Sequence, residues 1–143
     1  MSLRQKLCKQ LKGEEGFSSY AYLDTKGLLT IGHGRLIDKR HGGGLTAEEA
    51  EYLLGNDIAK CEVFLAESLP WAASLVEARQ GVLLNMCFQL GPAGLMGFRK
   101  MLAACRDARY AEAAEQMRNS KWATDTPARC RRLAHQMETG EWQ

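Results

Sequence analysis

The chain has 143 residues, of which 45% are hydrophobic, and a formal net charge of +2 at pH 7. A chain of this length matches one domain and buries roughly two thirds of its unfolded surface, so its composition excludes a disordered protein. The longest apolar run, GVLLNM at 81–86, is far shorter than the ~18 residues of a transmembrane helix, and the N-terminus lacks the apolar stretch of a signal peptide. The small net charge does not indicate a nucleic-acid partner. We therefore expect one globular domain with no stable membrane insertion and no export route of its own.

The five cysteines are odd in number and widely spaced, without a C-x-x-C motif or a histidine at metal-binding spacing. This pattern is typical of reduced thiols in the core of a protein made in a reducing compartment. We expect neither a disulfide framework nor a metal site.

The first fifteen residues predict a short helix. Leu3, Leu7 and Leu11 recur at helical spacing and form one apolar stripe. Gly13 is the expected end of this helix, which places Glu14 and Glu15 within or just after its last turn.

A β-hairpin follows in the sequence. Residues 20–23 and 28–31 are rich in β-forming residues, and the D-T-K-G sequence at 24–27 between them is typical of a turn that ends in glycine. The glycines between 32 and 44 predict an irregular third strand or a loop.

The rest of the chain is predicted to be helical. Thr46 and Glu49 form a capping box at the start of a helix of about 20 residues, after which helices are expected at about 73–90, 96–107 and 109–119. Thr126 and Pro127 open a last helix that Gly140 closes. The fold class is therefore α+β and mainly α.

The predicted domain covers 1–143 and consists of two lobes. A small β-bearing lobe spans about 13–50, a connecting helix about 46–66, and a helical lobe about 67–143 together with helix 2–12. A crevice between two lobes is a favoured ligand site.

Two carboxylates near the N-terminus suggest glycosidase chemistry. Glycoside hydrolysis needs one acid that protonates the leaving oxygen and a second carboxylate that activates water or attacks the sugar. Glu15 and Asp24, nine residues apart, are candidates, and the hydroxyl of Thr30 is placed to hold a water between them. From chemistry alone the alternative stays open, in which Glu15 is a solvated helix end and Asp24 only forms the turn.

Two ordered sequence matches carry a resemblance to a known family. The chain resembles the T-even phage lysozyme family, glycoside hydrolase family 24, in two places. The first is the pattern E-G-F-x(6)-D-T-x-G-x-x-T-I-G at 15–32. The second is a match that begins at 84–91 and continues in blocks to 142. Together they cover about two thirds of the chain, and 36–80 is the part not covered.

The resemblance implies a lysozyme-like fold and specific roles. Glu15 would be the general acid, Asp24 the carboxylate that positions and activates water, and Thr30 its hydroxyl companion, with inversion at the sugar carbon. No metal or organic cofactor is implied, because the carboxylate pair supplies the catalytic groups.

The same match implies supporting residues and a substrate surface. Arg129 would lie near Glu15, and Glu14 would face Arg132. Three further residues, all in the predicted helical lobe, would bind the sugar polymer through amides or an apolar wall: Gln89, Gln116 and Phe98. Trp122 and Trp142 are expected to be core or lobe-packing residues and not sugar platforms.

One segment departs from the family pattern. Where relatives carry G-x-G-H, this chain has Gly32-His33-Gly34-Arg35. We expect Arg35 to keep the ion pair that the family histidine makes with an acidic residue of the small lobe. His33 is interpreted as an exposed loop residue, with a substrate contact as the alternative.

The sequence thus predicts a muramidase that cleaves the β-1,4 bond between N-acetylmuramic acid and N-acetylglucosamine in bacterial peptidoglycan. The family resemblance further implies a phage or prophage endolysin: a monomer that accumulates in the host cytoplasm and reaches the periplasmic wall once a holin permeabilises the membrane. The alternatives are a lytic transglycosylase that cuts the same bond and a non-catalytic wall-binding or phage assembly module. Chitin in place of peptidoglycan also stays open.

Overall fold

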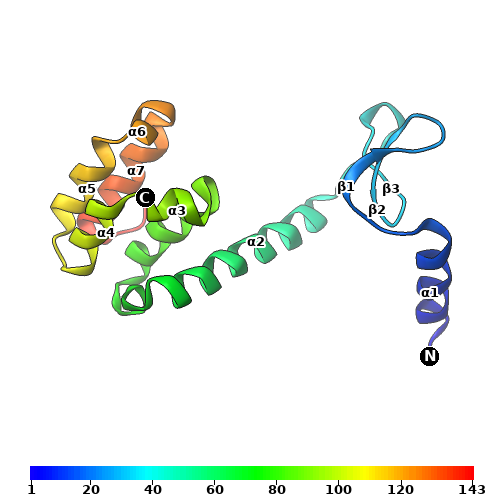
Figure 1. Cartoon of the computed structure of the whole chain (residues 1–143), viewed down its shortest axis with the longest axis horizontal. Helices are drawn as coiled ribbons and strands as arrows, with labels where there is room; N and C mark the ends of the chain where they lie inside the picture. Colours follow the sequence, from blue (N-terminus) through cyan, green and yellow to red (C-terminus); the bar gives the residue numbers. More distant parts are fainter. The chain divides into compact units, whose positions relative to one another are not determined.

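The computed structural model describes all 143 residues, which divide into two compact units, Met1–Leu53 (unit 1) and Leu54–Gln143 (unit 2). The chain is mainly helical and contains one small antiparallel sheet of three strands (Figure 1). The predicted fold class, α+β and mainly α, is confirmed. None of the helices could span a membrane by itself, and α3 (Glu77–Met96) and α4 (Arg99–Arg106) reach the necessary length and apolar composition only together, as a pair bent by 104°. The predicted lobe boundaries and the assignment of helix 2–12 stay predictions.

Unit 1 begins with helix α1 (Leu3–Glu15), which is longer than predicted. The expected end at Gly13 was wrong, because the helix continues until Gly16 adopts φ 70° and its N–H bonds to the Lys12 carbonyl. A glycine such as Gly13 is tolerated inside a helix. The positive φ at the end of α1, in contrast, requires glycine, which is Gly16. Glu14 and Glu15 consequently belong to the last turn of α1.

The sheet has the order β1 (Ser18–Leu23), β2 (Leu29–Gly32), β3 (Arg35–Leu36). The predicted hairpin is β1 and β2, and the irregular region after it contains the short β3. Ser18 pairs with Gly32 and Tyr22 with Thr30, so β1 holds two more residues than β2 between these pairs. This irregularity is a bulge in β1.

A short 3₁₀ turn, η1 (Lys39–His41), leads to helix α2 (Ala47–Ser68). The predicted capping box is confirmed, because the Glu49 N–H donates to Thr46 Oγ1 at 3.1 Å and the Thr46 N–H donates to Glu49 Oε2 at 2.9 Å. Helix α2 begins in unit 1 and continues into unit 2.

Unit 2 contains the remaining helices. They are η2 (Pro70–Ser74), α3 (Glu77–Met96), α4 (Arg99–Arg106), α5 (Tyr110–Arg118), α6 (Lys121–Asp125) and α7 (Pro127–Thr139). The gap expected between the helices at about 73–90 and 96–107 contains a kink inside α3, where Gly91 has φ 75° and ψ 167°. Helix α6 was not predicted, since it has only five residues and its start is marked by little more than the Ser120 cap.

The apolar core of the protein lies in unit 2. Helix α7 packs against α3, α5 and α6, and α4 packs against α5 (Figure 1). The largest side chains without solvent contact include Leu83, Met86, Leu95, Met117 and Met137. Gly140, at φ 74°, closes α7 as predicted.

The cysteines are all free, and four of them are buried in unit 2: Cys61, Cys87, Cys105 and Cys130. Burial raises the pKa of the Cys87 and Cys105 thiols to about 11, which makes them poor nucleophiles. The prediction of core thiols was wrong for Cys8, which is exposed on α1.

Candidate active site

The side chain of Glu15 lies at the C-terminal end of α1 and faces the turn between β2 and β3. A Cβ atom at Gly34 would come within 2.8 Å of Glu15 Oε2, so the carboxylate rests on the main chain of that glycine. Gly34 also has φ 75°, a conformation that other residues adopt only with strain. The positive φ therefore favours glycine at this position, and any larger residue would also displace the Glu15 carboxylate.

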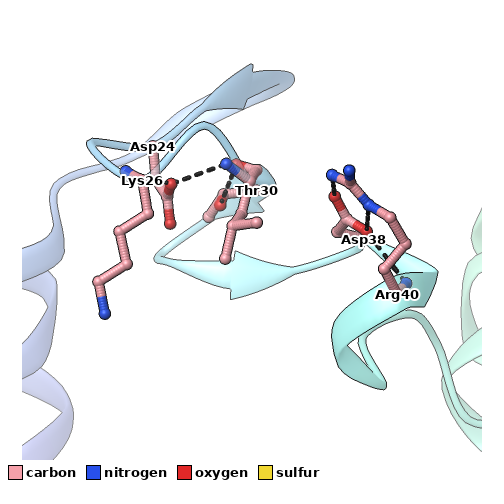
Figure 2. A network of polar contacts seen from close by, with 6 residues as sticks. Asp24, Lys26, Thr30, Asp38 and Arg40 are labelled. Carbon is pink, nitrogen blue, oxygen red and sulfur yellow. Dashed lines mark hydrogen bonds and ion pairs between the residues drawn. The ribbon is translucent and has the colours of Figure 1, made fainter.

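Asp24 is fixed by the turn that joins β1 and β2. Its Oδ1 accepts hydrogen bonds from the main-chain N–H groups of Lys26 and Leu28, both at 2.8 Å (Figure 2). The structure shows hydrogen bonds to Oδ1 alone, so turn formation leaves the second oxygen of this carboxylate free for other chemistry. Asp24 therefore forms the turn, which is one of the two roles that the sequence left open. This role is compatible with a catalytic one.

Thr30 is buried in β2 with 5% of its surface exposed. The Thr30 hydroxyl donates to the Leu28 carbonyl at 3.1 Å. The main-chain N–H of Leu28 in turn donates to Asp24. Leu28 therefore links the two candidate side chains, which lie at the same turn (Figure 2). The structure brings together Asp24 and Thr30, and it places Glu15 in the same unit.

Two ion pairs stabilise the segment around β3. Arg35 binds Glu49 through both guanidinium NH₂ groups, at 2.8 and 2.6 Å, and also donates to the Gly44 carbonyl at 3.1 Å. The expected pairing of Arg35 with an acidic residue of unit 1 is confirmed. The hydrogen bond from Arg35, aided by the Thr46 N–H, lowers the pKa of Glu49 from 4.5 to about 2.

Asp38 forms the second pair, with Arg40 (Figure 2). Its carboxylate accepts from Arg40 Nε at 2.8 Å, from Arg40 Nη2 and from the Arg40 main-chain N–H at 3.0 Å. The side-chain hydrogen bond is the main cause that lowers the pKa of Asp38 from 3.8 to about 2. Asp38 is buried, and these contacts satisfy its charge.

The predicted supporting residues have local partners. Glu14 accepts a hydrogen bond from Gln10 Nε2 at 3.2 Å. Arg129 donates from Nε to Asn85 Oδ1 at 2.8 Å, and Arg132 is exposed on α7. The pairings of Arg129 with Glu15 and of Arg132 with Glu14 join residues of different units and stay predictions.

The three predicted substrate residues, Gln89, Phe98 and Gln116, line one cavity of about 800 Å³ in unit 2. Trp122, buried as predicted, also lines this cavity, and its Nε1–H donates to Gln89 Oε1 at 2.8 Å. Because an indole N–H can only donate, this bond fixes the Gln89 carbonyl and leaves its NH₂ group for a ligand. Phe98 meets the Trp122 ring edge-on, with ring centroids 6.0 Å apart. The expectation of a core position was wrong for Trp142, which is exposed.

Sequence reasoning missed the basic side chains of this cavity. Arg99, Lys100 and Lys121 line it, and Lys121 also pairs with Asp125 at 3.4 Å. Arg99 and Lys100 directly follow Phe98, and Lys121 directly precedes Trp122. For Arg99 and Lys100, proximity to Phe98, which was already proposed for binding, was the available signal, whereas Lys121 had none.

Sequence reasoning also missed the contacts of His33, which was interpreted as an exposed loop residue, with a substrate contact as the alternative. His33 is exposed, but its Nδ1 contacts the Gly16 carbonyl and its ring lies 5.3 Å from that of Phe17. The pairing of Ser18 with Gly32, extended by one residue, places Phe17 opposite His33. Only strand register, which the sequence did not specify, reveals this pair.

Comparison with known proteins gives matches along most of the chain. The family model described as phage lysozyme matches residues 12–136. Two proteins of Dictyostelium discoideum, probable T4-type lysozyme 1 and probable T4-type lysozyme 2, are 29% and 30% identical to this chain, and each alignment covers 91% of this chain and 92% of the relative. The pre-baseplate central spike protein Gp5 of Enterobacteria phage T4 is 28% identical over 94% of this chain and 28% of its own length.

Proposed function

This chain belongs to the phage lysozyme family, a family of peptidoglycan hydrolases, and we propose that it is a muramidase that cleaves the β-1,4 bond between N-acetylmuramic acid and N-acetylglucosamine. The family match covers residues 12–136 and includes every residue of the proposed catalytic set. The main structural support for the proposal is that Leu28 forms hydrogen bonds with both Asp24 and Thr30. Glu15 lies in the same unit.

In this mechanism Glu15 is the general acid. It gives its proton to the glycosidic oxygen as the bond to the anomeric carbon breaks, and a water molecule attacks that carbon. Asp24 takes a proton from this water through the oxygen that the turn leaves free. A positioned acid or base of this kind supplies roughly 10²- to 10⁴-fold in rate.

Thr30 holds the attacking water. Its hydroxyl hydrogen is directed to the Leu28 carbonyl, so the Thr30 oxygen presents lone pairs that accept from water. We propose inversion at the anomeric carbon, for which the two carboxylates need a separation of roughly 6.5 to 9.5 Å with the water between them.

The cavity of unit 2 is proposed to bind the polymer. The NH₂ group of Gln89 and the amide of Gln116 suit sugar hydroxyls and N-acetyl groups, and Phe98 supplies an apolar wall. The chain acts as a monomer and uses no cofactor.

The decisive experiment is mass spectrometry of the fragments released from purified peptidoglycan. The wild-type chain should release muropeptides with ordinary reducing N-acetylmuramic acid ends, and Glu15→Gln should release almost none. Glu51→Gln, which removes an exposed carboxylate of α2, is the matched control and should behave as wild type. Products labelled in H₂¹⁸O and followed by NMR would give the anomeric configuration.

Other products would select a different activity. Anhydro-muramic ends would identify a lytic transglycosylase, which needs one acid and no water-activating carboxylate. That outcome would remove the role proposed for Asp24. Release of fragments from chitin but not from peptidoglycan would replace the substrate and leave the mechanism in place.

A second candidate function comes from the spike relative. The 28% identity to Gp5 extends over 94% of this chain, although it covers only 28% of that phage protein. A wall-binding or assembly module of a phage particle is therefore the alternative to a free enzyme. If the wild-type chain binds peptidoglycan in a pull-down but releases nothing, this alternative replaces the muramidase.

For the enzyme we propose the role of an endolysin, which accumulates in the host cytoplasm and acts on the periplasmic wall after a holin opens the membrane. Expression in a Gram-negative host should leave the culture intact until chloroform permeabilises the inner membrane, and the turbidity should then fall within minutes. Glu15→Gln at the same expression level should show no such fall. Lysis before permeabilisation would overturn the dependence on a holin.

A further inference from the structure

We propose that His33 is a positioning residue for Glu15, which it serves by holding the end of α1 against the turn between β2 and β3. This inference rests on the proposed function, in that Glu15 is taken to be the acid. The residues involved all belong to unit 1.

The first observation is the contact between His33 Nδ1 and the main-chain carbonyl of Gly16. A carbonyl oxygen only accepts, so Nδ1 carries the hydrogen and donates it. Gly16 is the residue that follows Glu15, and its φ of 70° turns the chain out of α1. The contact therefore attaches the β2–β3 turn to the peptide unit next to the candidate acid.

The second observation is the ring pair. His33 and Phe17 have ring centroids 5.3 Å apart at an interplanar angle of 46°. Together with the Gly16 contact, this pair fixes the imidazole at two points, one polar and one apolar. Both points lie between the end of α1 and the start of β1.

The third observation concerns what these contacts hold in place. Gly34, the residue after His33, supplies the main-chain surface on which the Glu15 carboxylate rests. The strand pair Ser18–Gly32 and the His33–Gly16 contact connect two consecutive residues, directly before Gly34, to the segment after Glu15. Loss of the His33 contact removes the one of these two connections that lies next to Gly34.

Removal of the His33 side chain is expected to misorient the Glu15 carboxyl group and to leave substrate binding unchanged. Misplacement of a catalytic group by about 1 Å costs up to roughly 10²-fold in rate. The side chain of His33 itself is not proposed to touch the sugar. Its removal should therefore lower kcat and leave KM close to the wild-type value.

The test compares three substitutions at His33 with one at another histidine. His33→Ala should lower kcat about 10- to 100-fold at unchanged KM. His33→Asn, whose amide nitrogen occupies the place of Nδ1, should recover kcat to within about threefold of wild type, whereas His33→Gln, whose amide nitrogen reaches the place of Nε2, should not. The matched control is His41→Ala, a change at an exposed histidine of η1, which should retain wild-type kcat.

Folding is measured in parallel by circular dichroism and thermal unfolding. The comparison of His33→Asn with His33→Gln remains informative if His33→Ala does not fold. Equal kcat for wild type and His33→Ala would overturn the inference, as would a change confined to KM, which would make His33 a substrate contact. An inactive wild-type chain would instead overturn the proposed function, and with it any role of His33 in that reaction.

Discussion

The two units of this protein are built on different principles. Unit 2 buries a continuous apolar core, in which Leu83, Met86 and Met117 have no solvent contact. Unit 1 buries only Thr30 and Asp38, and its local structure depends on hydrogen bonds, caps and ion pairs. The unit with the candidate catalytic groups is therefore held by directed polar contacts, each of which places a particular atom.

The difference has a physical reason. Apolar burial stabilises in proportion to area and does not specify orientation, whereas a hydrogen bond fixes the position of both partners. The Asp24 carboxylate, held by two main-chain N–H groups, is an example of such placement. We therefore expect substitutions in unit 1 to affect activity more than stability, and substitutions in unit 2 to do the reverse.

The largest effect on activity is expected from Asp24→Asn. The amide oxygen of asparagine still accepts from the Lys26 and Leu28 N–H groups, so the turn should persist. Loss of the charge removes the proposed base, and kcat should fall roughly 10²- to 10⁴-fold. Kinetics on peptidoglycan and thermal unfolding of the same sample would separate the two effects. A variant that loses its fold together with its activity would contradict the division between the units.

The largest effect on stability is expected from Leu83→Ala in α3. Leu83 is fully buried, and such truncations cost about 2 to 5 kcal/mol. The change should appear in urea unfolding followed by tryptophan fluorescence, because all three tryptophans belong to unit 2. At temperatures below the unfolding transition kcat should remain near wild type. A kcat reduced as strongly as in Asp24→Asn would show that core packing also sets catalysis.

A smaller effect is expected from Gln116→Ala in the cavity of unit 2. A lost neutral hydrogen bond costs about 0.5 to 1.5 kcal/mol, so KM should rise up to about tenfold with little change in kcat. Gln10→Ala, an exposed amide on α1 outside the cavity, is the control. An unchanged KM would remove Gln116 from the proposed substrate surface.

The smallest effect is the acid sensitivity of the Arg35–Glu49 pair. The pKa of Glu49 is lowered from 4.5 to about 2, so the pair contributes fully above pH 4.5 and loses its contribution as the pH falls toward 2. Because both side chains are partly exposed, the contribution is modest. Amide signals of Gly44 and Thr46 followed by NMR during acid titration should report the loss. Glu49→Gln should abolish this step, whereas Glu48→Gln should retain it.

Local patterns predicted most of the elements. The capping box at Thr46 and Glu49, the hairpin turn at Asp24 and the glycine that closes α7 at Gly140 all appear as expected. Each is decided within a few residues, by side-chain hydrogen bonds or by the backbone freedom of glycine. The end of α1 was misplaced because two glycines were available, and the choice of Gly16 over Gly13 depends on where the chain must turn.

The identity of the candidate site was present in the sequence through the pattern at 15–32, whereas its geometry was not. Sequence alone left Asp24 as either a turn former or a catalytic group, and the structure shows that the turn uses one of its two oxygens. For His33 it left an exposed loop position or a substrate contact, and strand register places His33 beside Phe17.

The sequence by itself determined the family, most of the helices and the hairpin, because these depend on residue types at short and regular spacings. Only the tertiary structure decided which atoms meet: Trp122 with Gln89, Arg35 with Glu49, and Glu15 with the surface of Gly34. Such contacts join residues separated along the chain, and their existence depends on strand register and helix packing. Spacing along a sequence does not fix either of these.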